Sequence, residues 1–254
     1  MTAKFKDYFS DSSKEYSRYR PNYPVELFSY LAAISVHHQK AWDCATGSGQ
    51  AALQLAEHFA EVIATDASES QIRNAAEKEN IHYQVATAEN SNITSNSIDL
   101  IAVAQAFHWF DIEAFSVEAN RVLKEDGILA IWTYNLLSIS DDIDEIVGHL
   151  YGSILEKYWA FERRMVENGY SSVQLPFKEL DAPAFYMHSK WSLPKLLGYL
   201  STWSAVKKYQ QETGNDPVEE LYEDILAAWG QPDQLLPVSW PLGIRVWKKH
   251  NPPP

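Results

Sequence analysis

The chain has 254 residues, which is long enough for one α/β domain with an insertion or for two small domains, and its composition, 46% hydrophobic and 22% charged, is that of an ordinary globular protein. Its formal net charge of -13 argues against a nucleic-acid or anionic-membrane partner, and it has no apolar run as long as a membrane span and no signal-peptide core. Its single cysteine, Cys44, cannot form an intramolecular disulfide or a cysteine-based zinc site. We therefore expect a cytoplasmic protein.

Short apolar runs alternate with helical stretches over much of the first half of the chain. Residues 1–40 are expected to form two helical pieces, separated by the two prolines of RPNYP at 20–24. Strands are then predicted at residues 41–45, 62–66, 81–87, 98–105 and 128–134, and helices at residues 50–60, 68–80 and 111–126. This alternation predicts a parallel, doubly wound sheet with right-handed crossovers.

The alternation stops after residue 135. Residues 141–180 and 192–229 are predicted to be largely helical, whereas residues 185–191 and 238–249 are predicted to be two late strands that pair antiparallel. The expected organisation has three parts: an N-terminal helical segment (1–40), an α/β core (41–134), and a helical insertion completed by the last two strands (135–254).

The loop after the first predicted strand has the features of a nucleotide-type binding site. Gly47 and Gly49 precede a helix, so the backbone can approach a ligand closely. Ala52 holds the position of a third glycine, which the dinucleotide fingerprint permits, so spacing alone does not exclude NAD. Asp43, inside the strand, would oppose a pyrophosphate and suits a cationic ligand. Asp66, at the end of the second strand, can accept hydrogen bonds from two ribose hydroxyls or cap a helix.

Five blocks of sequence resemble the class I S-adenosylmethionine-dependent methyltransferases in order and spacing. They are DCATGSGQ (43–50), VIATDAS (62–68), VATAEN (85–90), IDLIAVAQAFHWFD (98–111) and RVLKEDGILAIW (121–132). The segments RPNYP, AQAFHWF and residues 199–221 resemble more narrowly the trans-aconitate methyltransferase-like group of type 11 methyltransferases. The resemblance implies a Rossmann-like, mostly parallel seven-stranded sheet with an antiparallel last strand and a helical lid insertion.

The same resemblance implies a function. It is that of an enzyme that methylates a small molecule, with a carboxylate as the best-known acceptor in the group. The cofactor would be S-adenosyl-L-methionine, the product S-adenosyl-L-homocysteine, and no metal would be needed. The transfer is an in-line displacement from an activated donor, so alignment of the reacting atoms can supply most of the rate.

The resemblance also implies which residues hold the cofactor. Asp43, Gly47 and Gly49 match the loop at the methionine part, and Asp66 matches the acid on the ribose. The remaining positions match segments beside the adenine (Ala67, Ser68, Ala88 and Glu89), beneath the methionine and the methyl group (Gln105 and Ala106), and over the cofactor (Tyr16 and Arg20). Ala45 stands where many members have a glycine, and a positive φ there would cost about 1 kcal/mol.

His108 is the candidate general base, because it follows the fourth predicted strand. A hydroxyl or amine acceptor would need such a base, whereas a carboxylate would not. The alternative is that His108 and Trp109 form a structural wall of the cofactor pocket. Trp132 and Tyr134 could line the acceptor pocket or belong to the core, and Trp203 could line it or pack between helices.

The amino-acid sequence leaves two other functions open. One is a non-catalytic cofactor-binding or interaction protein on the same fold, and the other is an NAD-dependent oxidoreductase, which Asp43 disfavours. Metal binding is not expected, since the adjacent His37 and His38 lack the helical spacing of ligands and the acids at 141–144 are typical of a helix start.

Overall fold

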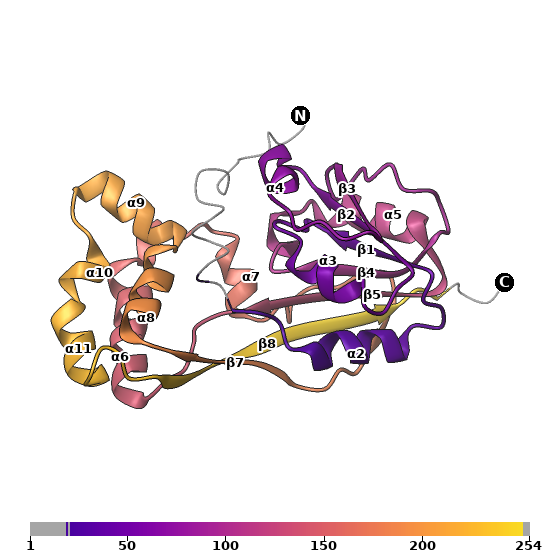
Figure 1. Cartoon of the computed structure of the whole chain (residues 1–254). Helices are drawn as coiled ribbons and strands as arrows, with labels where there is room; N and C mark the ends of the chain where they lie inside the picture. Colours follow the sequence, from indigo (N-terminus) through magenta and orange to yellow (C-terminus); the bar gives the residue numbers. More distant parts are fainter. Residues whose placement is uncertain (1–18, 20, 251–254) are drawn as a thin grey trace.

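The computed structural model describes residue 19 and residues 21–250, and a single β-sheet forms its centre (Figure 1). Its strands are β1 (Lys40–Cys44), β2 (Glu61–Asp66), β3 (Ile81–Val85), β4 (Ile98–Ala104), β5 (Leu123–Tyr134), β6 (Lys178–Leu180), β7 (Phe185–Trp191) and β8 (Leu236–Lys248). They follow the order β3-β2-β1-β4-β5-β8, with β6 and β7 both paired to β8. The first five strands are parallel, and β8 is antiparallel to β5. The predicted doubly wound, mostly parallel α/β fold is therefore confirmed.

The outer edge of the sheet differs from the prediction. β6 pairs with the C-terminal part of β8, where Lys178 lies opposite Lys248, and β7 pairs with its N-terminal part, where Phe185 lies opposite Leu242. The described residues consequently form eight strands rather than the predicted seven. Pro183 stands between β6 and β7 and has no amide hydrogen to donate to a strand ladder, which accounts for the break.

Helices cover both faces of the sheet. Those of the α/β part are α2 (Val25–Ile34), α3 (Gln50–Leu55), α4 (Glu69–Arg73), the 3-10 turn η2 (Phe107–Trp109) and α5 (Ile112–Val122). α2 and α3 pack on one face through Leu27, Phe28 and Leu55. α5 packs on the opposite face through Phe115 and Val122. Coverage of both faces explains why all but the last residue of β4 are buried.

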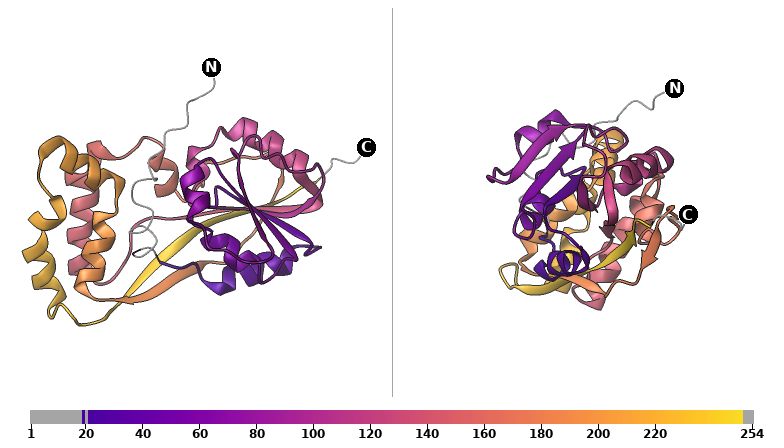
Figure 2. Two further views of the ribbon diagram at one scale, coloured as in Figure 1. Left: turned by 45° about the horizontal axis from the view of Figure 1, so that its top comes forward. Right: turned by 90° about the vertical axis from the view of Figure 1, so that its right-hand side faces the viewer.

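A helical lobe stands apart from these layers and is joined to them by β7 and β8 (Figures 1 and 2). It consists of α6 (Asp141–His149), the π-helical turn η3 (Leu150–Ile154), the 3-10 turn η4 (Glu156–Tyr158), α8 (Leu193–Ser201), α9 (Ser204–Thr213), α10 (Pro217–Glu220) and α11 (Tyr222–Trp229). Its core is aromatic: the Trp203 ring centroid lies 5.9 Å from that of Tyr151 and 5.6 Å from that of Trp159. The short helix α7 (Arg163–Glu167) lies instead against β5 and η2.

Several helices are shorter than predicted, because tertiary hydrogen bonds take over their backbone groups. α3 ends at Leu55 rather than at residue 60, where the Asn80 amide donates to the carbonyls of Ala56 and Phe59. α4 ends at Arg73 rather than at residue 80, and the Tyr83 hydroxyl donates to the carbonyl of residue 76. Pattern alone does not reveal these partners, which lie up to 24 residues away along the chain.

The N-terminal segment can be placed only in part. Residues 25–34 form α2, which packs on the sheet beside α3. Tyr16 and Arg20, the two residues predicted to close over the cofactor, lie outside the described residues.

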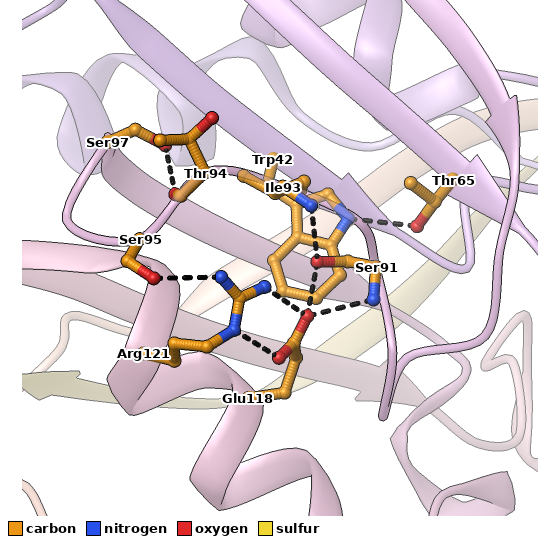
Figure 3. Close-up of polar contacts among 9 residues, drawn as sticks. All are labelled: Trp42, Thr65, Ser91, Ile93, Thr94, Ser95, Ser97, Glu118 and Arg121. Carbon is orange, nitrogen blue, oxygen red and sulfur yellow. Dashed lines mark hydrogen bonds and ion pairs between the residues drawn. The ribbon is translucent and has the colours of Figure 1, made fainter.

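A polar network fixes the segment between β3 and β4 to helix α5 (Figure 3). Glu118 of α5 is buried and accepts hydrogen bonds from the amide and the hydroxyl of Ser91. Arg121 donates to the same carboxylate at 2.8 Å and to the Ser95 hydroxyl at 3.0 Å. Mainly because of the hydrogen bond from Arg121, the pKa of Glu118 falls to about 2. The network thus anchors the segment that carries Ala88 and Glu89.

Replacing Glu118 with Gln should lower the free energy of unfolding by about 2 kcal/mol, because it removes the charged acceptor of several buried hydrogen bonds. Urea denaturation measures this change, and Glu113→Gln, on the exposed side of the same helix, is the control. The ionised carboxylate contributes stability above its ordinary pKa of 4.5 and loses it as the pH falls toward 2, so the difference should shrink over that range. If the difference in unfolding free energy between wild type and Glu118→Gln stayed the same down to the lowest pH, the charge of Glu118 would not be its cause.

Candidate functional site

The carboxyl ends of β1 and β2 bring two loops together around one acid. β1 and β2 are parallel neighbours, so both end at the same edge of the sheet. Asp66, the last residue of β2, accepts a hydrogen bond from the Gly47 amide at 2.9 Å and another from the Ser68 amide at 2.8 Å. It therefore joins the loop after β1 to the loop after β2. A carboxylate has further lone pairs with which it can accept hydrogen bonds from a ligand.

The glycine loop has a left-handed backbone at three positions. Ala45, Gly47 and Gly49 have φ values of 58°, 56° and 84°. A Cβ atom at Gly49 would overlap the Tyr83 hydroxyl, so another residue there would have to displace the Tyr83 side chain and adopt a strained backbone, whereas a Cβ atom at Gly47 would meet nothing within 4 Å. The loop thus presents its backbone to open space at Gly47, directly ahead of α3. This is the arrangement that a closely approaching ligand requires.

Asp43 lies behind this loop and has no exposed surface. Its Oδ2 accepts a hydrogen bond from the Thr46 hydroxyl at 2.5 Å, but its Oδ1 has no hydrogen-bond partner of normal geometry in the described part of the chain. Burial raises its pKa to about 7, although the Thr46 hydroxyl and the nearby Ala52 amide oppose the change. A buried, incompletely satisfied carboxylate is costly, and a cation bound beyond the loop would favour its ionised form. Asp43 can act on such a ligand through its field rather than by contact.

The residues predicted to lie beside the adenine follow β2 and β3. Ala67 is half-buried and Ser68 is buried, and the Ser68 hydroxyl caps α4 by accepting from the Gln71 amide. Ala88 is buried, and the Glu89 carboxylate accepts a hydrogen bond from the Asp111 amide at 3.1 Å. The amide of residue 86 donates to the Asp66 carbonyl, so both segments meet beside Asp66.

Gln105, just beyond β4, holds β4 to β5. Its φ is 57°, a conformation that costs a non-glycine residue about 1 kcal/mol and that recurs at functional sites. Its side-chain amide donates to the Tyr134 carbonyl at 3.0 Å, and its Oε1 accepts from the Thr133 hydroxyl and the Tyr134 amide. Because that side chain is fully engaged with β5, Gln105 offers a ligand its backbone, as does the buried Ala106 that follows.

His108 is buried in η2, where its Nδ1 lies 2.9 Å from the Tyr170 hydroxyl. Burial, assisted by the positive charge of Arg163, lowers the pKa of His108 to about 3. Burial likewise raises the pKa of Tyr170 well above its usual value. Both rings are therefore neutral at physiological pH, and an imidazole with such a low pKa is a weak base. This geometry favours a structural wall over a general base.

The aromatic candidates for acceptor binding separate into core and surface. Trp132 has no exposed surface and packs edge-on against Tyr23 and Phe28, so the structure places it in the core rather than in an acceptor pocket. Tyr134 is 5% exposed, with its ring centroid 6.4 Å from that of Tyr23, and Trp203 is 5% exposed within the lobe's aromatic core. Trp109 is 38% exposed, with its ring centroid 4.7 Å from that of His108.

Arg163 is a functional candidate that the sequence pattern does not single out. It lies on α7, yet its Nη2 donates to the Oδ1 of Asn135, the residue after β5, at 3.1 Å. Its Nε donates to the Tyr151 hydroxyl at 3.1 Å, and its guanidinium carbon lies 4.8 Å from the Trp159 ring centroid. Its charge also acts on His108. Only the fold brings residue 163 to the ends of β4 and β5, so no local motif could reveal it.

Comparison with known proteins identifies the family. Residues 42–131 match a methyltransferase-domain family. The chain is 34% identical over 253 residues to a protein of Dictyostelium discoideum described as a methyltransferase. The aligned residues cover 97% of this chain and 96% of that protein. It is 41% identical to a solved protein of Anaeromyxobacter dehalogenans described as a type II methyltransferase, with a TM-score of 0.86 over 91% of this chain and 99% of that one.

A third relative names the cofactor in its description. CRG1 of Saccharomyces cerevisiae, described as an S-adenosylmethionine-dependent methyltransferase, is 29% identical over 131 residues, which cover 48% of this chain and 45% of CRG1. The chain belongs to the class I S-adenosylmethionine-dependent methyltransferases. Within residues 19 and 21–250, no group of three or more histidine, cysteine or acidic side chains could hold a metal ion, and no helix has the length and apolarity to cross a membrane.

Replacing Ala45 with glycine should stabilise the free protein by about 1 kcal/mol, because glycine tolerates the left-handed backbone found there. Chemical denaturation measures the change. The matched control is Ala51→Gly in α3, which should be destabilising because that residue is helical and buried. A loss of stability in Ala45→Gly would contradict the described backbone conformation.

Proposed function

We propose that this methyltransferase transfers the methyl group to a carboxylate oxygen of a small organic acid, without a general base. The proposal rests mainly on the state of His108, the one predicted base. Its side chain is buried and neutral, and it is hydrogen-bonded to the Tyr170 hydroxyl. A carboxylic acid is ionised at neutral pH and needs no deprotonation before it attacks. The resemblance to the trans-aconitate methyltransferase-like group supports the same acceptor class.

The chain's own residues fit the cofactor. When bound, S-adenosylmethionine supplies a methyl group already activated by its sulfonium. Asp66 would accept hydrogen bonds from the ribose hydroxyls, and the backbone at Gly47 and Gly49 would approach the methionine part. The buried Oδ1 of Asp43 would stabilise the positive charges through its field. Ala67, Ser68, Ala88 and Glu89 would line the adenine, and the backbone of Gln105 and Ala106 would lie beneath the methyl group.

The helical lobe would cover the acceptor. Its first helices follow β5 and the others follow β7, and it stands beyond the carboxyl ends of the parallel strands, where the sites of doubly wound sheets lie (Figure 1). Its aromatic core, with Trp203, supports the ring of Trp159 and thereby Arg163. Together with the N-terminal segment that carries Tyr16 and Arg20, the lobe would exclude water and align the acceptor, which is the main task left to the protein in this reaction.

Calorimetric titration tests the cofactor, and isotope transfer tests the reaction. S-adenosylhomocysteine should bind, whereas NAD, run in parallel, should not. Incubation with methyl-¹³C-labelled S-adenosylmethionine and a panel of small carboxylic acids, alcohols and amines should label only methyl esters of acids. Binding with no labelled product over the panel would favour a non-catalytic cofactor-binding protein instead. Labelled ethers or methylamines would contradict the carboxylate acceptor.

Asp43→Asn should have opposite effects on stability and on ligand binding. Since burial raises the folded-state pKa of Asp43 to about 7 from an ordinary 3.8, its stability contribution is full below 3.8 and is lost as the pH rises through about 7. The variant should therefore be more stable than the wild type at about pH 8 but not at about pH 4. It should also bind S-adenosylhomocysteine more weakly at the higher pH. Equal stability at both pH values would show that the carboxylate is not under strain.

His108→Asn should leave the shape of the pH profile unchanged. In both proteins, kcat for an acid acceptor at saturating cofactor should not fall as the pH drops through 6.5, the ordinary pKa of an imidazole. The reason is that burial lowers the pKa of His108 to about 3. The absolute rate can fall, since His108 supports Tyr170. A limb near pH 6.5 that is present in the wild type and absent from the variant would restore His108 as the base.

A further inference from the structure

We propose that Arg163 is a specificity-determining residue, which binds an anionic group of the acceptor other than the carboxylate that is methylated. The inference rests on the proposed function, because it assigns a residue to the acceptor side of the same site. It predicts that the enzyme prefers acids with a second anionic group over matching neutral compounds.

The position of Arg163 is the first observation. α7 lies against β5 and η2, so it places Arg163 beside the carboxyl ends of the two strands that adjoin the predicted position of the methyl group. Its Nη2 donates to Asn135 at 3.1 Å, and its charge contributes to the low pKa of His108. The same guanidinium lies over the rings of Trp159 and Tyr151 in the lobe, with carbon-to-centroid distances of 4.8 Å and 5.5 Å. Arg163 thus connects the sheet to its helical cover.

The absence of a counterion is the second observation. Among the described residues, Arg73, Arg121 and Arg245 each form an ion pair with a glutamate. Arg163 is half-buried and forms none with any carboxylate that the structure describes. Its hydrogen-bond partners there, Asn135 and Tyr151, are both neutral, and its Nη1 donates to no described residue. A partly desolvated guanidinium without a carboxylate is unusual, and its two-pronged shape matches that of a carboxylate ligand.

Tyr151 is the positioning residue for this guanidinium. Its hydroxyl donates to Glu167 at 2.6 Å, which leaves the oxygen as an acceptor for the Nε of Arg163. Burial raises the pKa of Tyr151 to about 12, so it stays a neutral phenol. Tyr151 belongs to the π-helical turn η3, in which the Leu155 amide donates to the Leu150 carbonyl. π-Helical turns are rare and occur frequently at functional sites.

The chemistry explains why the bound group is not the methylated one. A carboxylate held by two hydrogen bonds from a guanidinium has its lone pairs and its charge drawn toward the cation, which makes it a poorer nucleophile. The same contact fixes the rest of the acceptor and so leaves a distant carboxylate free to attack. Aromatic faces on the lobe side limit water around Arg163 and strengthen the attraction.

The test compares diacids with their monoamides on the whole 254-residue chain. Succinate and glutarate, paired with succinamate and glutaramate, are titrated into the protein saturated with S-adenosylhomocysteine, and methyl transfer to each is measured with S-adenosylmethionine. Wild type should favour each diacid at least tenfold, in affinity and in kcat/KM. Arg163→Gln should abolish that preference mainly through KM, and Arg163→Lys should retain part of it. Arg164→Gln, at the adjacent exposed arginine, is the matched control and should behave as wild type.

Further readouts separate a specific role from a structural one. Tyr151→Phe should raise KM for the diacids but not for the monoamides, with no change in the affinity for S-adenosylhomocysteine. A preference for diacids that survives in Arg163→Gln, or no diacid binding to the wild type, would overturn the inference. Arg163-dependent diacid binding without any methyl ester would refute the proposed function but would leave Arg163 as the residue that binds an anionic group.

Discussion

The parallel pairing of β1 with β2 on one side and with β4 on the other is the constraint on which the rest of the structure depends. Asp43 of β1 lies opposite Ala64 of β2 and Ala102 of β4, so the loops that follow these strands must emerge at one edge. The edge gathers the left-handed glycine loop, Asp66 and the strained Gln105 without any need for these residues to be close in sequence. The flanking helices make that pairing stable, because they bury both faces of the sheet.

Acidic and basic side chains lie at opposite sides of this edge. On the β1 and β2 side lie the carboxyl groups of Asp43 and Asp66, and burial raises the pKa of Asp43 to about 7, so that a bound cation would favour its ionised form. On the lobe side, Arg163 provides positive charge without a carboxylate partner among the described residues. Between them, His108 and Tyr170 are neutral. This distribution of charge supports the proposed reaction, in which an anionic acceptor attacks the sulfonium and no proton is transferred.

The positions of the candidate site residues at the strand ends were largely predictable, because these residues follow the strands in a repeating pattern. Gly47, Gly49 and Asp66 are recognisable from local sequence. The positive φ considered for Ala45 is present in the structure, where it is 58°. Residues whose role depends on distant contacts were not predictable. Arg163 reaches the site only because α7 folds back onto β5, and strand periodicity could not show that Trp132 lies on the face of the sheet covered by α2. The split of the edge strand depends on Pro183 and on the length of β8, which only the paired structure reveals.

The most direct test of the account is a crystal structure of the complex with S-adenosylhomocysteine. We expect both ribose hydroxyls to lie within hydrogen-bonding distance of the Asp66 carboxylate, and the methionine part to cross the loop at Gly47 on the same side as the buried Asp43. We also expect the sulfur to face the ends of β4 and β5, toward Arg163. A ligand bound elsewhere, or a ribose that makes no contact with Asp66, would contradict the central claim.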